Sequence, residues 1–448
     1  MKIDKLIKTI ILFGLAVMTT SCEKYLEEPS SKSFAVIGTL DDLEALLDHS
    51  SMNLSPNAQE ISADNYYLSD NSWNALQFEQ EQNMYIWANS NVVRDGNSTN
   101  DWSTIYRAVF TANTVLESLD VITVKLNEKE RWDRIKGAAL FFRAFSFLDA
   151  VQIWSVAYDR NTADRDVGIP LRLRSDFNIT SPRANVAETY GQVIKDLKAA
   201  VKLLPDKVAS KTRPSKPAAY GLLARTYLWM GEYGQAKLYA DSCLMLNDGL
   251  LDYNTLNSAA NFPVPRHNVE VILERQGSTG LILGVQNAKV LPAIYASFED
   301  NDLRKTVFFA KGNDGQVAFK GYYFGFAALM TGVATDEILL TRAECLARIG
   351  MLDESLNDLN KLLKSRWSDQ VNFEPVDARL RDDVLRIILE ERRKELLFRG
   401  QRWMDIKRLN KEGADISLQR TVNGKVYELK ANSPRFALPL PDDLLGYY

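Results

Sequence analysis

The chain has 448 residues, of which 46% are hydrophobic and 25% charged, and these proportions exclude an intrinsically disordered protein. Its formal net charge is −4 at pH 7 and no basic stripe is clustered along it, which argues against a nucleic-acid-binding surface. Three cysteines are too few for a disulfide framework, and the two histidines, His49 and His267, lack the spacing of metal ligands.

Residues 1–21 are predicted to be a signal peptide. Lys2, Lys5 and Lys8 precede an apolar run, Ile10 to Met18, of the length found in secretory signals. The run is shorter than the roughly 20 apolar residues that cross a bilayer as a helix. Removal of the leader takes away three lysines and one aspartate, so the net charge falls from −4 to about −6.

Cys22, directly after this leader, is expected to carry a lipid. Small residues, Thr19, Thr20 and Ser21, precede it, as a processing peptidase requires. A secretory signal that ends in this way resembles the lipobox of bacterial lipoproteins, in which the thiol is acylated and the cysteine becomes the first mature residue. Thr19 stands where leucine is commoner, and an ordinary secretory signal with an incidental cysteine is the alternative. Residues 22–33 are then the lipidated cysteine and a polar tether.

The rest of the chain is predicted to be mainly α-helical, because apolar residues recur at three- and four-residue spacing in most long segments. Residues 217–246 have the packing residues of a tetratricopeptide repeat, with Gly231 ending the first helix. Residues 336–363 repeat that arrangement. Residues 134–154 and 190–206 are expected to form another such hairpin, with a long insertion between them. Hairpins of this type stack into a superhelix.

Two long insertions, residues 51–101 and 247–333, differ from these helical segments. They are rich in Asn, Ser, Gly and aromatic residues and have weak periodicity. Long irregular insertions on a rigid scaffold usually carry function. We therefore expect one domain over residues 34–448, with a helical scaffold at about 102–246 and 334–410 and a ligand face built by the two insertions.

No catalytic motif is evident. The chain has no phosphate-binding loop, nucleophile elbow or zinc-protease motif. Asp41–Asp42, Asp382–Asp383 and Glu390–Glu391 are neighbours along the chain, whereas glycoside hydrolysis needs two carboxylates that face each other across a cleft. We expect no enzyme activity, no cofactor and no metal.

The densest charged run, LEERRKELLFRGQRWMDIKRLN at residues 389–410, is open to two interpretations. It could form a cationic binding patch. Its charges also have the spacing that stabilises a helix, in the pairs Glu390–Lys394, Glu391–Lys394 and Arg392–Glu395. We favour the structural interpretation, in which arginines join helices on either side of Gly400.

Five segments together resemble the SusD/RagB family, the outer-membrane nutrient-binding lipoproteins of Bacteroidetes. They are DWSTIYRAVFTANTVLESL (101–119), FFRAFSFLDAVQIW (141–154), TDEILLTRAECLARIGMLDESLNDLN (335–360), ILEERRKELLFRGQRWMDIKRLN (388–410) and NSPRFALPLPDD (432–443). The likeness covers nearly the whole mature chain.

This resemblance implies a cell-surface protein, lipid-anchored in the outer membrane, that covers a TonB-dependent transporter of the SusC type as a lid. Family members bind an oligosaccharide or, in some cases, a peptide. The helical scaffold is held to contact the transporter, and the inserted loops to hold the cargo.

The family shares no fixed ligand motif, so candidate binding residues come from chemistry alone. A sugar presents apolar C–H faces and rims of hydroxyls, which suit exposed rings beside amides. Two stretches, 63–76 and 321–325, offer such side chains outside any helical pattern: Tyr66, Tyr67, Asn71, Trp73, Asn74, Tyr322 and Tyr323. These rings could instead pack the loops onto the scaffold.

Two further functions stay open. A repeat scaffold that binds only protein would bury its loop aromatics. A secreted glycosidase would need a facing pair of carboxylates.

Overall fold

The structure is a computed structural model that describes residues 38–93 and 100–441, so the predicted signal peptide, Cys22 and the whole predicted tether lie outside the described residues. The described chain is mainly helical, and its strands have two to five residues each. This confirms the predicted fold class. None of the helices in these ranges is both long and apolar enough to cross a membrane.

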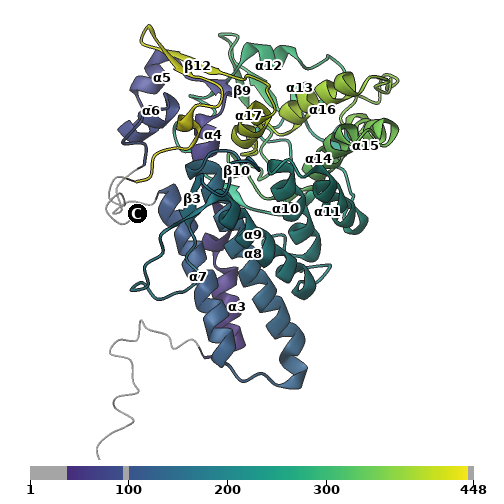
Figure 1. Cartoon of the computed structure of the whole chain (residues 1–448). Coiled ribbons are helices and arrows are strands. Elements are labelled where there is room, and N and C mark those ends of the chain that lie inside the picture. Colours follow the sequence, from purple (N-terminus) through teal and green to yellow (C-terminus); the bar gives the residue numbers. More distant parts are fainter. Residues whose placement is uncertain (1–37, 94–99, 442–448) are drawn as a thin grey trace, which may run out of the picture.

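Long helices form a stack in which successive members pack side by side (Figure 1). Their bounds are α7 Asp101–Val121, α8 Lys129–Trp154, α9 Val186–Leu203, α10 Lys216–Trp229, α11 Tyr233–Leu246, α14 Thr335–Arg348, α15 Leu352–Lys364 and α16 Arg381–Glu395. The predicted hairpins correspond to α8 with α9, α10 with α11, and α14 with α15, and each of these pairs is in contact.

Two glycines make the tight turns inside these hairpins. Gly231, between α10 and α11, has φ of 72°, and Gly350, between α14 and α15, has φ of 87°. These left-handed conformations favour residues without a Cβ, which is why glycine ends each first helix.

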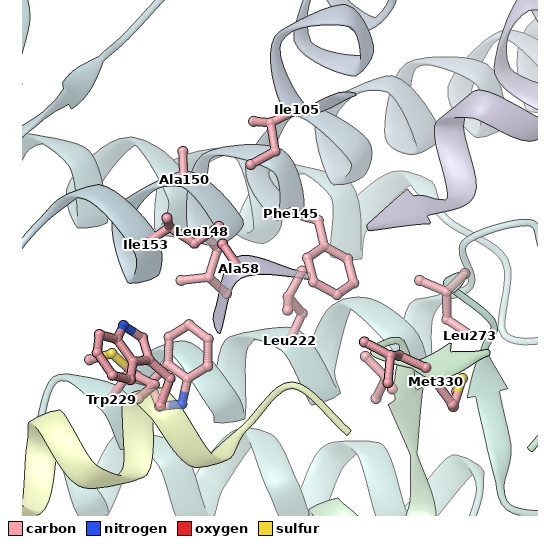
Figure 2. Close-up of a cluster of buried hydrophobic side chains, with 14 of the residues drawn as sticks. Ala58, Ile105, Phe145, Leu148, Ala150, Ile153, Leu222, Trp229, Leu273 and Met330 are labelled. Carbon is pink, nitrogen blue, oxygen red and sulfur yellow. The ribbon is translucent and has the colours of Figure 1, made fainter. Parts of the chain in front are cut away.

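Helix α8 is in contact with α3, α4, α7, α9 and α10. Every residue from Gly137 to Trp154 is buried, so this part of the helix has no solvent-exposed face. Such a helix must be surrounded on all sides. Figure 2 shows Phe145 and Leu148 of α8 beside Ala58 of α4 and Leu222 of α10. Helix α3 (Leu40–Asp48), capped by Thr39, packs along α7 and α8.

The two loop-rich ranges are less irregular than their composition predicts. They contain short helices: α4 Ala58–Ser62, α5 Asp70–Asn74, α6 Glu79–Tyr85, α12 Pro292–Ala296 and α13 Arg304–Val307. They also contain the single-turn 3₁₀ helices η1 Ser50–Asn53 and η3 Tyr253–Thr255, and two more lie outside them, η2 Leu126–Glu128 and η4 Pro434–Phe436.

Short strands join the two ranges to each other. β1 (Leu54–Ser55) pairs in parallel with β6 (Gln276–Gly277), and β2 (Tyr66–Tyr67) pairs antiparallel with β7 (Lys289–Val290). Antiparallel partners elsewhere are β10 Leu329–Met330 with β6, β5 Val271–Leu273 with β11 Val333–Ala334, β8 Phe309–Lys311 with β9 Val317–Phe319, β3 Val167–Pro170 with β4 Arg183–Asn185, and β12 Leu418–Val422 with β13 Lys425–Leu429. The insertions therefore form one connected layer over the scaffold.

The charged run at 389–410 is structural, as predicted. It forms the end of α16, a turn at Gly400 and α17 (Arg402–Lys411). Arg392 and Arg408 are buried; Arg392 Nε donates to Asp405 at 2.9 Å, and Arg408 Nη1 donates to Glu344 at 2.6 Å. These bonds join α16, α17 and α14.

Candidate functional site

A cavity of about 530 Å³ lies where the loop-rich layer meets the scaffold. Its wall includes residues of β1, α4, α6 and β6 from the two insertions, together with the first turn of α7 and the last residues of α8. Cavities of this size hold small organic ligands. We take this cavity as the candidate site.

Asp101, the first residue of α7, fixes one wall of the cavity. Its carboxylate accepts hydrogen bonds from the backbone N–H groups of Asn57 at 3.2 Å and of Ala58 at 2.8 Å. A carboxylate at this position satisfies the free N–H groups at the start of α4 and suits the positive end of that short helix. Asn100, the residue before, caps α7 through Ser103. The starts of the two helices are therefore held together.

The inner surface of the cavity is apolar. Ala58 and Ile61 of α4 and Ile153 and Trp154 of α8 line it, and each is at most 2% exposed. Ala58 and Ile153 also belong to the buried cluster drawn in Figure 2, so the cavity lies directly on the main core. Rigid core packing beneath the site keeps this surface in a fixed shape.

The rim of the cavity carries amides and a hydroxyl: Asn57, Gln77, Gln80, Gln276 and Ser278. Asn57 Nδ2 donates to the Ser278 carbonyl at 3.1 Å, which joins the two insertions across the rim. Gln80 Nε2 donates to Asn91 Oδ1 at 2.9 Å. Within the described ranges the side chains of Gln77 and Gln276 make no hydrogen bond, so their amide groups are available to a ligand.

The arrangement suits binding better than catalysis. An amide side chain offers both a donor and an acceptor, which matches the hydroxyls of a polyol, and an apolar floor suits its C–H faces. Glu81 and Asp101 are the carboxylates of the described wall. Of these two, Asp101 already accepts two backbone hydrogen bonds that hold the start of α4 in place, so its role is structural.

Three of the predicted binding rings are buried, and the expectation that they form exposed platforms is wrong. Tyr66, Tyr322 and Tyr323 are 2%, 2% and 3% exposed. Tyr66 donates to the Ile61 carbonyl at 2.9 Å, and Tyr323 donates to Glu270 at 2.9 Å. Because their hydroxyls find partners inside the protein, these tyrosines fill the core beneath the insertions and leave no ring face for a sugar.

The other four predicted residues lie nearer the surface but outside the cavity. Tyr67 is half-buried and lines a separate pocket of about 230 Å³. Asn71 and Asn74 are exposed, and Trp73 is half-buried against the core. The amides of Asn74 and Asn423 exchange hydrogen bonds at 3.1 and 3.0 Å, which holds α5 against the β12–β13 hairpin.

None of the seven predicted binding residues is part of the described wall of the candidate cavity. Gln77, Gln80, Gln276 and Ser278 were missed, although all of them fall within the two ranges expected to build the ligand face. A usable signal was the run of glutamines just after the predicted stretch, QFEQEQ at residues 77–82.

Neither histidine is placed at the cavity. His49 caps η1 through Ser51, and His267 Nε2 lies 2.8 Å from Glu274. In the part of the chain that the structure describes, no cluster of His, Cys, Asp or Glu is arranged to hold a metal ion.

The fold is a helical-repeat scaffold of stacked hairpins. Long insertions on this scaffold form a cavity of ligand size. Residues 24–228 match the profile of a family described as starch-binding and associating with the outer membrane, and residues 336–438 match that of the SusD family. The chain belongs to the SusD/RagB family.

Relatives and solved structures are consistent with this. SusD-like protein P38 of Formosa agariphila is 24% identical over 394 aligned residues, which cover 72% of this chain and 74% of that protein. A SusD-like carbohydrate-binding protein from Bacteroides vulgatus superposes with a TM-score of 0.69 at 21% identity, over 92% of this chain and 96% of that one. A SusD superfamily protein from Bacteroides thetaiotaomicron gives 0.73 at 19% identity, over 91% and 98%. At these identities the structures establish the fold alone.

Proposed function

We propose that the protein captures an oligosaccharide in the 530 Å³ cavity. The observation that carries this proposal is an apolar floor with two rim amides, Gln77 and Gln276, whose side chains make no hydrogen bond to the described residues. Sugars are bound by contacts to their C–H faces and by neutral hydrogen bonds to their hydroxyls. The description of the matched family as starch-binding supports the same class of ligand.

The captured sugar is delivered to a SusC-like TonB-dependent transporter, which the protein covers as a lid. It is held on the outer face of the outer membrane by a lipid on Cys22. The lipobox-like sequence and the family's association with the outer membrane support this location. The helical scaffold contacts the transporter, and residues 51–101 and 247–333 hold the cargo. A peptide cargo in the same role is the alternative.

The protein acts by binding, without catalysis. The matched family is described as starch-binding, and Asp101 already binds the start of α4. Burial of Tyr66, Tyr322 and Tyr323 favours a second candidate, a repeat scaffold that binds only protein. The cavity, with its apolar floor and rim amides, favours sugar binding over this second candidate.

A calorimetric screen of the mature chain against plant, host and microbial polysaccharides, with peptides as a separate arm, tests the proposal. We expect a saturable signal with one glycan class. Because the contacts are neutral, the affinity should change little between 50 mM and 500 mM salt, concentrations that differ roughly threefold in Debye length. A signal with peptides alone would transfer the role to peptide cargo. Silence in both arms would favour the protein-binding scaffold.

A further inference from the structure

The connection between α7 and α8 is unusually apolar for an exposed turn. Residues 121–126 read VITVKL, without the Gly, Pro, Asn or Asp that exposed turns favour. Val121 is 80% exposed and Leu126 is 95% exposed, and Ile122 and Val124 are half-buried beside them. We call residues 121–126 the tip. Exposed aliphatic side chains concentrated in one turn mark a contact surface.

The tip lies at the end of the molecule where the described chain begins. Arg131 and Arg134, in the first turns of α8, bind Glu44 of α3 at 3.0 and 2.6 Å, and Arg131 also pairs with Asp41. Helix α3 starts at Leu40, so its start and that of α8 are adjacent (Figure 1). The segment that precedes Gly38 therefore joins the fold beside the tip.

The tip is far from the cavity. Asp101 at the cavity wall is the first residue of α7, and Val121 is the last of its 21 residues. A helix of that length spans about 30 Å. Contacts at the tip can therefore hold the molecule without covering the cavity.

The start of α8 has the side chains of a membrane interface. The half-buried ring of Trp132 is flanked by the ammonium groups of Lys129 at 4.7 Å and Lys136 at 4.6 Å. An aromatic ring with long cationic side chains around it suits the boundary between headgroups and acyl chains.

We propose that the tip inserts into the surface of the lipid layer that holds the anchor. The inference rests on the lipid anchor proposed at Cys22. That cysteine is 16 residues before Gly38, a span of at most about 55 Å when fully extended. Tethering at such a distance gives the tip a high effective concentration at the membrane, so a contact of only a few aliphatic side chains suffices.

Hydrogen exchange on the mature chain, coupled through Cys22 to vesicles, tests this proposal. The vesicles are phosphatidylcholine with a few per cent of a maleimide-headgroup lipid. Cys243 and Cys345 are fully buried, and burial raises the pKa of both thiols, so coupling is directed to Cys22. We expect the amides of residues 119–128 to exchange at least threefold more slowly on vesicles than in the uncoupled chain. The exposed loop at residues 171–182 should be unchanged.

Leu126→Asn should abolish this protection. Leu380→Asn, the same change at a 68% exposed leucine before α16, is the matched control and should preserve it. Both positions are exposed, so neither variant should lower the Tm. Equal exchange of residues 119–128 with and without vesicles would overturn the proposal, as would protection that survives Leu126→Asn. Protection that requires an added SusC-like transporter would assign the tip to that partner and would also overturn it. None of these outcomes depends on cargo binding, which the calorimetric screen tests separately.

Discussion

Glu60 is a fully buried carboxyl group in α4, the short helix that forms one wall of the cavity. Asn65 Nδ2 and the backbone N–H of Gly400 each donate to it at 3.0 Å. Burial raises its pKa to about 7, because the charged form loses its water, and these two hydrogen bonds only partly offset that loss. The folded protein therefore holds this proton more tightly than the unfolded chain does.

This shift predicts a pH-dependent stability contribution. Between pH 4.5 and about 7 the folded state binds more protons at Glu60 than the unfolded state, so the free energy of unfolding falls as pH rises. The loss is about 3 kcal/mol, on the order of 1.4 kcal/mol per pKa unit. Glu60→Gln lacks this dependence. Urea unfolding at pH 5 and pH 8 should show the advantage of the wild type over the variant shrinking by about 2.5 kcal/mol, because part of the loss already occurs below pH 5. A difference that is the same at both pH values would contradict the buried-proton account.

Tyr323 illustrates why the binding residues could not be predicted. It stands between glycines in a segment without helical periodicity, which indicated an exposed loop. In the structure its hydroxyl donates to Glu270 at 2.9 Å and lies 3.2 Å from a carboxylate oxygen of Asp336, and Arg399 lies 4.6 Å from the ring centre. These partners come from distant segments, so no local pattern distinguishes this ring from an exposed one.

The helices α16 and α17 illustrate the same limit at the scale of elements. The run at 389–410 was correctly predicted to be structural, and the Glu391–Lys394 pair forms at 2.7 Å. Glu390 instead pairs with Arg386 at 3.1 Å. Spacing along one helix predicts which charges are neighbours, whereas packing against other helices decides which of them are buried together.

Arg408 should matter far more than Arg386, although both are arginines in ion pairs. Arg408 makes two hydrogen bonds to buried Glu344 of α14, at 2.6 and 2.8 Å. Arg408→Met leaves buried carboxylates without this partner and should lower the free energy of unfolding by about 3 kcal/mol or more. Arg386→Met removes a pair whose side chains are both 59% exposed and should cost less than about 1 kcal/mol.

Urea denaturation at pH 7 compares the two variants. Equal losses would show that the buried arginines do not hold α14 and α17 together.

The helical hairpins could be predicted because their signals are local. Apolar spacing marks each helix, and Gly231 and Gly350 mark the turns where a left-handed conformation is needed. Short elements such as α4 and β1 could not, because two to five residues carry no periodicity. They form through contacts between distant parts of the chain. In β1, for example, Leu54 pairs with Gln276 of β6, which lies 222 residues later in the sequence.

At the scale of the whole molecule, the cavity is assembled from both insertions and from the scaffold helices α7 and α8. Asn57, Gln77, Asp101 and Gln276 line it, and only the fold brings them together. The sequence predicts a ligand face in two ranges that contain much of this wall, since loop-rich insertions on a repeat scaffold are where a site is expected. It could not indicate which side chains point inward, because that depends on pairing between the insertions.

Calorimetric titration of the glycan found in the screen, on the double variant Gln77→Ala, Gln276→Ala, tests the central claim most directly. The account predicts a Kd at least tenfold weaker, a loss of about 1.4 kcal/mol or more, with an unchanged Tm. Asn71→Ala removes an exposed amide outside the cavity and should leave the Kd within about twofold, under roughly 0.5 kcal/mol. An unchanged Kd in the double variant would contradict the account, because the sugar would then be bound somewhere other than this cavity.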